Sequence, residues 1–343
     1  MIRKAVPRAG AMHVSSPLVW RLFADLCDGE FHSGEELART LGVTRSAVWK
    51  AANALRDLGA PMEAVRNRGY RFPVAGEPLV SATIHDALSR DVRERVSRLD
   101  VAWSTGSTNT ELMERENPPP GRSEVLLAEF QTAGRGRRGR TWLSPPGGAV
   151  CLSLSWTFPE MPRDAGALSL AIGVCVLRAL ESHGASNVRL KWPNDVLVED
   201  HKLGGILIEL RAEAAGPACA VVGIGLNVAL GAGLLEQIAA TGLPAVDLTS
   251  ITGGAVSRNA LASSLVECCL GGLREFEQDG LRPFLEEWRH ADALRDRNVV
   301  LKAGDESSRG VARGIDLTGA LLVETPAGLR KFFSGEVTVR PGD

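Results

Sequence analysis

The stretch Gly134-Arg-Gly-Arg-Arg-Gly-Arg140 places four arginines and three glycines in seven consecutive residues. Such a run does not suit a core helix or strand. Glycine lets the backbone approach a ligand closely and adopt positive φ, and guanidinium groups are forked donors that suit phosphate or carboxylate. The stretch therefore predicts an anion-binding loop. A basic run by itself is more often a solvated face or a polyanion patch, so nucleic-acid binding is the alternative.

Motifs on both sides of this loop favour a ligand site over a general basic patch. In chain order they are Ser107-Thr-Asn109, Gln131, Lys191-Trp-Pro-Asn-Asp195, Lys202-Leu-Gly-Gly-Ile206 and Gly225-Leu-Asn227. With the arginine loop, this series resembles biotin protein ligase, in the bifunctional form that is also the biotin operon repressor. The similarity runs from about Leu18 to Arg340, and the combination is far more specific than any one tripeptide.

The resemblance implies a two-step reaction with biotin and ATP as substrates and Mg²⁺ as a cofactor. The biotin carboxylate attacks the α-phosphate of ATP, which gives biotinyl-5′-adenylate and diphosphate. A lysine amine of a biotin carboxyl carrier protein then attacks the mixed anhydride and forms an amide. Because no covalent enzyme intermediate is needed, catalysis depends on aligning and neutralising two anions, which favours Arg, Lys and Mg²⁺.

The resemblance also implies which residues hold biotin, with neutral partners at its ureido ring and cations at its carboxylate. The implied biotin-binding residues are Ser107, Thr108, Asn109, Gln131, Arg135, Gly136, Arg137, Lys202 and Gly205. The implied catalytic residues are Lys202, Arg137 and Asp195. Simpler interpretations exist, because Ser107-Thr-Asn109 is also typical of a polar turn or helix cap, and Lys202 could be an exposed lysine after a turn.

Nucleotide binding is implied for a second, overlapping set of residues. These are Arg135, Arg137, Arg138, Arg140, Trp142, Asn194, Asn227 and Arg340. Trp142 offers a flat face on which adenine could stack, although a core tryptophan is the commoner role. Asn194 and Asp195 could instead be turn residues after Pro193. The metal ligands are undetermined, with Asp195 as a candidate for the Mg²⁺ that accompanies ATP.

Residues 18 to 73 show the pattern of a winged helix. Ser33-Gly-Glu-Glu36 predicts a capping box that begins one helix, Gly42 ends it, and Thr44 begins the next. On that second helix Val48, Ala51, Leu55 and Leu58 repeat at helical spacing, which predicts an inward face. The expected DNA-binding residues are the outward Arg45, Ser46, Trp49, Lys50, Asn53 and Arg56, with Arg68 of the following hairpin. A protein-docking three-helix module is the alternative.

The expected fold class is multidomain α+β, with an N-terminal winged helix, a central α/β catalytic domain and, by resemblance, a C-terminal SH3-like β-barrel. The expected divisions are a flexible extension (1–17), a winged helix-turn-helix DNA-binding domain (18–76), a biotin ligase catalytic domain (77–290) and the C-terminal domain (291–343). Strands are predicted in the centre at 125–130, 151–158, 188–192, 195–198, 206–210 and 220–228, and a helix at 165–182. Five more strands are predicted at 299–302, 309–315, 320–323, 331–333 and 336–340.

Composition restricts the class of protein. With 343 residues, 44% of them hydrophobic, and a net charge of −2, the chain should form two or three folded domains. Residues 1–76 carry a net charge of +4 and the remainder −6, which places any polyanion contact near the N-terminus. The six cysteines include no Cys-x-x-Cys pair and predict buried thiols in a reducing cytoplasm. The uncharged run from Ala214 to Leu235 contains five glycines, and we interpret it as a buried strand and turn, not a membrane helix.

Two other functions remain open from the sequence. Lipoate ligase has a related catalytic domain and the same adenylate chemistry. A non-enzymatic DNA-binding regulator that senses biotin or ATP is the other, although the retained Lys202 and arginine loop disfavour it. Because one small winged helix buries little surface, we expect a homodimer on operator DNA when biotinyl-5′-adenylate is bound. No membrane partner is expected.

Overall fold

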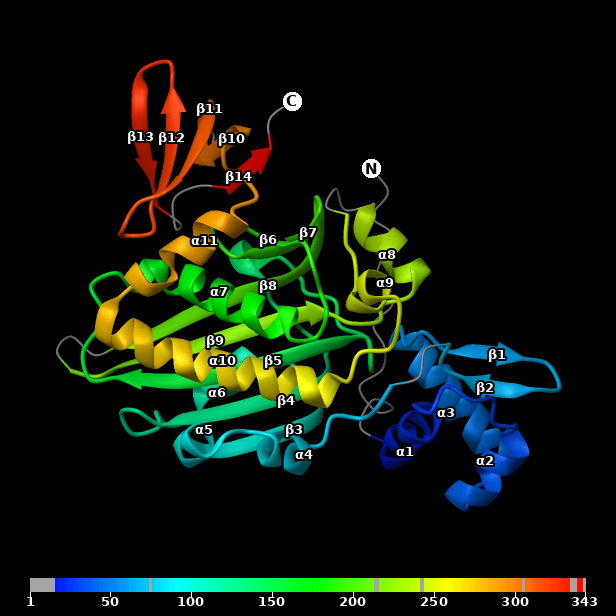
Figure 1. Ribbon diagram of the computed structural model, residues 1–343. Helices are drawn as coiled ribbons and strands as arrows, with labels where there is room; N and C mark the ends of the chain where they lie inside the picture. Colours follow the sequence, from blue (N-terminus) through cyan, green and yellow to red (C-terminus); the bar gives the residue numbers. More distant parts are fainter. Residues whose placement is uncertain are drawn as a thin grey trace.

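The computed structural model describes residues 16–73, 76–212, 216–240, 244–303, 306–333 and 338–341. Within these ranges the side chains of 303, 306 and 338–341 are not described. The expected N-terminal extension lies outside the described residues up to position 15, as do residues 74 and 75 near the end of the expected DNA-binding domain. The described chain forms a winged helix at one end, a large central sheet and a smaller sheet at the other end (Figure 1).

The winged helix is confirmed, and local sequence signals set its boundaries. Its elements are α1 (Pro17–Leu26), α2 (Gly34–Leu41), α3 (Arg45–Asp57), β1 (Glu63–Val65) and β2 (Gly69–Arg71). Ser33 Oγ accepts the Glu36 N–H at 3.1 Å, and Thr44 Oγ1 accepts the Ala47 N–H at 3.2 Å, so both expected caps form. Gly42 ends α2 with φ of +67°, a conformation that glycine adopts without strain.

The central sheet has seven strands in the order β3-β4-β5-β9-β8-β7-β6. Only the β3–β4 pairing is parallel among these described strands. The strands are β3 (Val96–Thr105), β4 (Ser123–Gln131), β5 (Ala149–Phe158), β6 (Val188–Lys191), β7 (Asp195–Val198), β8 (His201–Ala212) and β9 (Ala218–Asn227). Each of the six strands expected here overlaps one of them. The edge strand β3 was not predicted, because charged residues at its start and half-buried ones after it obscure the apolar alternation.

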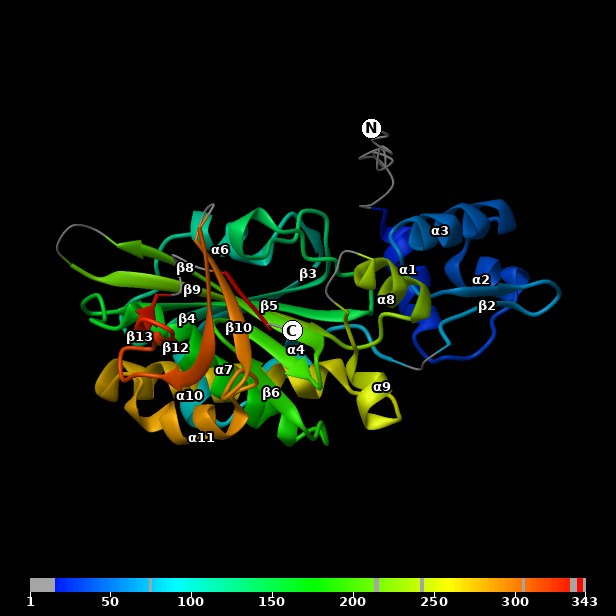
Figure 2. The same ribbon diagram turned by 90° about the horizontal axis from the view of Figure 1, so that it is seen from above.

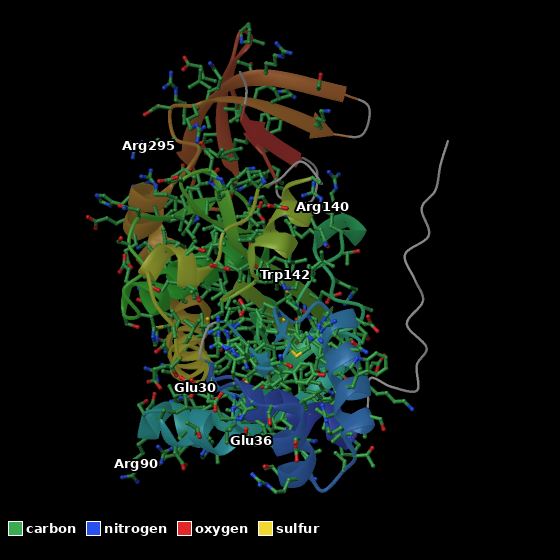
Figure 3. All side chains as sticks on the ribbon, turned by 90° about the vertical axis from the view of Figure 1, so that its right-hand side faces the viewer. Glu30, Glu36, Arg90, Arg140, Trp142 and Arg295 are labelled. Carbon is green, nitrogen blue, oxygen red and sulfur yellow. The ribbon has the colours of Figure 1, made fainter. Side chains whose placement is uncertain are left out.

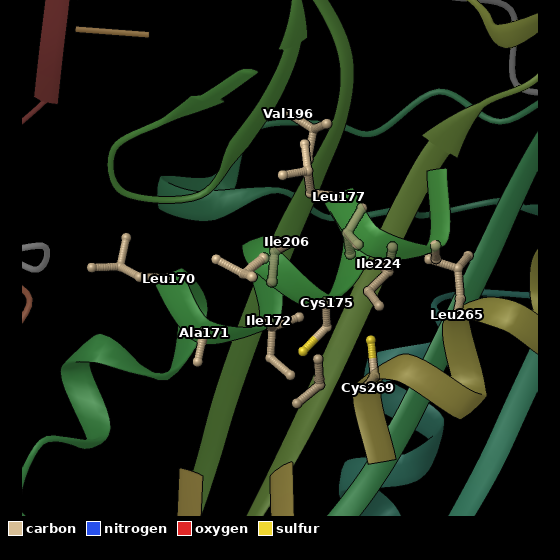
Figure 4. Packing of buried hydrophobic residues seen from close by; sticks show 14 of the residues in the cluster. Leu170, Ala171, Ile172, Cys175, Leu177, Val196, Ile206, Ile224, Leu265 and Cys269 are labelled. Carbon is tan, nitrogen blue, oxygen red and sulfur yellow. The ribbon is translucent and has the colours of Figure 1, made fainter. Parts of the chain in front are cut away.

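Helices cover the two faces of this sheet unequally (Figure 2). The central helices are α4 (Ser81–Asp86), α5 (Arg90–Arg95), α6 (Thr108–Glu114), α7 (Leu168–Glu181), α8 (Ala232–Ala239), α9 (Leu248–Thr252), α10 (Arg258–Asp279) and α11 (Leu285–Ala291), with short 3₁₀ turns at Arg137–Gly139, Ala165–Ala167 and Arg282–Phe284. In Figure 2, α7, α10 and α11 lie on one face, and α6 lies on the other. The main apolar core, which includes Cys175 and Cys269, fills the space between α7, α10 and the sheet (Figure 4).

The uncharged run is a buried strand, as expected, since β9 occupies residues 218–227 at the middle of the sheet. None of the described helices combines the length and the apolar composition needed to cross a bilayer. All six cysteines are free thiols, and burial raises the pKa of Cys27 and Cys175 to about 12.

The C-terminal strands are β10 (Asn298–Ala303), β11 (Glu306–Ile315), β12 (Leu321–Thr325), β13 (Gly328–Phe332) and β14 (Thr338–Pro341). They pair antiparallel in the order β13-β12-β11-β10-β14, and each overlaps an expected strand. In the part of the chain that the structure describes, no pairing joins β13 to β14, so the strands form a five-stranded sheet and not a closed barrel. Trp192 connects this sheet to the centre, because its indole N–H donates to the Gly319 carbonyl at 3.0 Å.

A buried ion pair fastens the chain where it enters the central unit. Arg258 and Glu129 are 2.8 Å apart, with side chains only 3% and 1% exposed. Glu129 also accepts the Leu79 N–H at 2.6 Å, and Arg258 donates to the Glu77 carbonyl at 2.7 Å. The pair therefore holds the segment that follows the winged helix against the sheet.

We expect Arg258→Ala to lower the free energy of unfolding by about 3–5 kcal/mol, because it leaves the Glu129 charge buried without its partner. Urea unfolding followed by circular dichroism measures this. The matched control is Arg297→Ala, whose partner Asp200 is 2.7 Å away in an exposed pair, and which should cost about 0–1 kcal/mol. Equal losses in the two variants would show that the buried pair has no special role.

Candidate active site

A cavity of about 1030 Å³ is lined by the start of α6, the arginine loop and residues of β5, β8 and β9. In Figure 2, α6 lies on the face of the central sheet opposite α7 and α10. The cavity wall includes these residues expected from the sequence: Ser107, Thr108, Asn109, Gln131, Arg135, Gly136, Arg137, Arg138, Arg140, Trp142, Asn194, Asp195, Lys202, Gly205 and Asn227. Residues that lie up to 120 positions apart in the chain therefore share one space. The remaining expected residue, Arg340, lies in β14, where side chains are outside the described part of the structure.

The polar end of the cavity is built around the start of α6. Ser107 Oγ caps the helix, as its simpler interpretation predicted, and the residue is also part of the cavity wall. Thr108 donates its N–H to Gln131 Oε1 at 2.8 Å and its hydroxyl to the same oxygen at 3.2 Å. Ser153 Oγ, from β5, lies 2.7 Å from Thr108 Oγ1 and 2.6 Å from Asn109 Oδ1. This end is neutral and rich in hydrogen-bonding groups.

Asn109 is buried, and both hydrogens of its amide group are engaged. Its Nδ2 donates to the Leu207 carbonyl at 3.1 Å and to Glu209 Oε2 at 3.0 Å, both on β8. Its Oδ1 lies over Gly223 of β9, where an added Cβ would be only 2.2 Å from that oxygen. Glycine at 223 is therefore required for Asn109 to reach the sheet.

The arginine loop closes on itself beside this polar end. The backbone N–H of Trp142 donates to the Gly134 carbonyl at 2.9 Å, and the backbone N–H of Gly136 donates to the Arg140 carbonyl at 2.7 Å. Arg138 adopts φ of +57°, the left-handed region. An added Cβ at Gly134 would lie 2.5 Å from the Trp142 carbonyl oxygen, so the first glycine permits the closure. The tight turn directs several guanidinium groups toward one cavity.

Cations dominate the charge of the cavity wall. The wall includes four arginines and two lysines, against Asp195 as the one carboxylate among its described lining residues. Arg137 is half-buried and donates to Asn194 Oδ1 at 3.4 Å. Burial lowers the pKa of the Arg137 guanidinium, Arg138 and Arg140 lower it further, and Asp195 acts in the opposite direction. This surplus of positive charge suits a polyanionic ligand.

Lys202 is half-buried and is not the exposed lysine of the simpler interpretation. Its Nζ lies 2.5 Å from Asp195 Oδ1 and 5.9 Å from the Trp142 ring centroid. The Lys202 backbone is held by hydrogen bonds to Pro244 and Val246, and Asn227 Nδ2 donates to the Lys202 carbonyl at 3.2 Å. Asn227 thus positions Lys202 in addition to being part of the cavity wall.

Trp142 packs against the sheet near the middle of the molecule, whereas Arg140 lies nearer the surface (Figure 3). The Trp142 indole packs over Gly225 of β9, which has no side chain; an added Cβ there would be 2.6 Å from the indole. Trp142 is half-buried and is part of the cavity wall. The residue therefore packs against the sheet and also lines the cavity.

Among the residues that the sequence did not predict, Ser153, Glu209 and Gly223 make the contacts that place Asn109. A weak signal exists for two of them. Ser153 and Ser155 are polar residues at alternate positions of an otherwise apolar strand, and Glu209 is the one charge between Lys202 and Arg211. Their contacts with α6 join separate parts of the chain, and no local pattern specifies such contacts.

A second candidate surface lies on α3 of the winged helix. Arg45, Ser46, Lys50 and Arg56 are exposed, Asn53 is half-buried, and Trp49 is 58% exposed. The opposite face, Val48, Ala51 and Leu55, is buried as expected, whereas Leu58 is only half-buried at the helix end. In the hairpin, the Arg68 guanidinium lies 4.0 Å from the Phe31 ring centroid, which orients it beside α2.

Comparison with known proteins gives matches to three domain families. The Biotin/lipoate A/B protein ligase family matches residues 101–227, an HTH domain matches 27–71, and the Biotin protein ligase C terminal domain matches 296–340. The chain is 38% identical to the bifunctional ligase/repressor BirA of Escherichia coli (strain K12), over 94% of this chain and 97% of that protein. It is 32% identical to BirA of Bacillus subtilis (strain 168), over 90% and 94%.

Among solved structures, the biotin protein ligase from Aquifex aeolicus in complex with biotin and ATP aligns with a TM-score of 0.61 at 28% identity. The alignment covers 72% of this chain and 100% of that one.

Proposed function

This chain belongs to the biotin protein ligases, in their bifunctional ligase/repressor form, and from that premise we propose that it biotinylates a carrier protein and represses biotin genes. The first activity joins biotin to the AMP part of ATP with release of diphosphate, and then transfers the biotinyl group to a lysine of a biotin carboxyl carrier protein with release of AMP. The second places the winged helix on operator DNA.

One observation carries the ligase proposal: a single cavity has a neutral polar end and a cationic end. Thr108, Asn109 and Gln131 provide hydrogen-bonding groups for the ureido ring. Lys202 and the arginine loop provide the charges that a carboxylate and phosphates require. The Aquifex ligase, whose fold this chain shares, is known with biotin and ATP.

In the first step, a biotin carboxylate oxygen attacks the α-phosphorus, and the bond to the β-phosphate breaks to release diphosphate. Both reactants are anions, so the residues that align and neutralise them supply the catalysis. Lys202 Nζ is the cation assigned to the carboxylate and α-phosphate. Arg137 adds a second positive charge, and Arg138 and Arg140 are assigned to the other phosphates of ATP.

In the second step, the neutral amine of the acceptor lysine attacks the biotinyl carbonyl, AMP leaves, and the amine loses a proton as the amide forms. Asp195 is the carboxylate assigned to orient this lysine. It is paired with Lys202 at 2.5 Å, so the incoming amine would meet an ion pair already in place. Trp142 is assigned to the adenine ring and Asn227 to the phosphates.

The Mg²⁺ that accompanies ATP fits this residue set. Among the described residues no group of three or more His, Cys, Asp or Glu side chains could hold a metal by itself. Mg²⁺ usually takes one or two protein ligands together with substrate phosphates, and Asp195 and Asn194 are the residues that would hold it. When bound, it would neutralise charge on the phosphates.

For the repressor, we propose a homodimer that forms on binding biotinyl-5′-adenylate and presents two copies of α3 to a palindromic operator. We also propose that the domains divide between residues 76 and 77 and between residues 290 and 291, and that the protein is cytoplasmic. Two contacts support the first boundary, since Glu77 and Pro78 are hydrogen-bonded to Asn259 of α10, in the central unit.

The test is transfer of radiolabelled biotin to a purified biotin carboxyl carrier domain. With ATP and Mg²⁺ present we expect label on the carrier, and none when ATP is omitted. Lipoate in place of biotin should give little transfer. Preferred transfer of lipoate would assign the chain to lipoate ligases, and adenylate binding without transfer would leave only a regulator.

A further inference from the structure

Glu209 connects two parts of the site that are separate in sequence. It lies on β8, beyond the Lys202–Ile206 motif, and its side chain is 25% exposed. Its Oε2 accepts from Asn109 Nδ2 at 3.0 Å and from Arg135 at 2.7 Å, and its Oε1 accepts from the same Arg135 nitrogen at 2.9 Å. One carboxylate therefore joins the α6 end of the cavity to the arginine loop.

We propose that Glu209 is a positioning residue that couples biotin recognition by Asn109 to the docking of the arginine loop through Arg135. The inference rests on the proposed ligase function. Beyond that function, it assigns to Glu209 two tasks: to orient the amide of Asn109 and to hold the arginine loop in position.

The first half of the coupling is the orientation of the Asn109 amide. A carboxylate and a backbone carbonyl can only accept, so Glu209 and the Leu207 carbonyl together hold the Nδ2 group on the β8 side. The Oδ1 atom is then directed to the Gly223 and Ser153 side of the cavity. Ser153 occupies one lone pair of Oδ1, and the second lone pair is the acceptor that matches a ureido N–H.

The second half is the position of the loop. Arg135 precedes Arg137, Arg138 and Arg140, and like charges so close in sequence repel one another at short range. Glu209 supplies an opposite charge from the rigid sheet, in a charge-assisted contact to Arg135. The loop is thereby held against the same carboxylate that orients Asn109.

Glu209→Gln removes the carboxylate charge with little change in side-chain size, and so tests both the orientation of Asn109 and the docking of the loop. A glutamine carries no charge and has an NH₂ group in place of one carboxylate oxygen, so it loses the contact that Oε1 makes with Arg135 and weakens the charge-assisted contact at Oε2. We expect the KM for biotin to rise at least tenfold and the KM for ATP to rise as well, because the loop also carries the arginines assigned to the phosphates, while kcat changes less than threefold. Without ligands, trypsin cleavage within residues 135–140 should be at least fivefold faster. Glu209→Asp, which keeps the charge, should restore part of both losses.

The matched control is Glu124→Gln on β4, a strand that β5 and β9 separate from β8 in the same sheet. Glu124 is 21% exposed, accepts from Arg115 at 3.0 Å and is not part of the cavity wall, so it repeats the charge change without the coupling. Biotin KM and loop cleavage in Glu209→Gln within twofold of this control would overturn the proposal. A higher biotin KM with unchanged loop cleavage would overturn it too.

Two arms keep the test independent of folding and of the ligase assignment. If Glu209→Gln fails to fold, Arg135→Gln should reproduce the faster loop cleavage, and its absence would count against the coupling. If the unaltered chain forms no biotinyl-adenylate, the ligase proposal fails, while cleavage of the ligand-free variants still decides whether Glu209 holds the loop.

Discussion

Replacement of Lys202 by alanine is expected to slow biotinyl-adenylate formation by roughly 10²- to 10³-fold, the loss typical of one preorganised electrostatic contact. The Nζ cation lies in the cavity beside Asp195 and is held there by backbone contacts to residues 244 and 246. Alanine removes the charge that offsets repulsion between the carboxylate and the α-phosphate. It also leaves the Asp195 carboxylate without its partner, which adds repulsion toward both anions.

Biotin-dependent exchange of labelled diphosphate into ATP measures this first step without the carrier protein. The matched control is Lys331→Ala, because Lys331 pairs with Asp316 at 2.7 Å on the C-terminal sheet, far from the cavity wall. The control should keep its exchange rate. A Lys202→Ala variant with the full rate would refute the assignment of this lysine.

The second large effect is expected on operator binding. Replacing Arg45 and Lys50 together by alanine should weaken binding at least 100-fold, since each lost contact to a base or phosphate is worth about 1–3 kcal/mol and a dimer loses both copies. Both residues are exposed on α3, so the winged helix should fold normally. Adenylate formation should be unaffected, because neither residue is part of the cavity wall.

A gel shift on the promoter of the protein's own biotin genes, with and without biotin and ATP, measures this effect. Binding should strengthen with both ligands and fall steeply with salt. The paired control, Arg90→Ala with Arg98→Ala, removes two exposed charges from the central unit and should bind as the unaltered chain does. A shift that is indifferent to ligand, or no shift at all, would leave the ligase and discard the repressor.

The sequence by itself determined the features that depend on residues close together in the chain. Ser33, Gly42 and Thr44 set the helix limits of the winged helix, because caps act through hydrogen bonds within one turn. The strands β5 and β9 were predictable because a strand buried inside a sheet has a nearly continuous apolar run. The ligand motifs were recognisable from residue order and spacing, which needs no tertiary structure.

Only the tertiary structure decided which of these elements meet. The sheet places β9 between β5 and β8, and this order brings Gly223, Ser153 and Glu209 to Asn109. It also shows that Lys202 faces Asp195, and that within the described residues β13 and β14 are not paired with each other. Strand order and cross-sheet contacts result from burial of apolar faces over the whole chain, and a local sequence pattern carries no record of them.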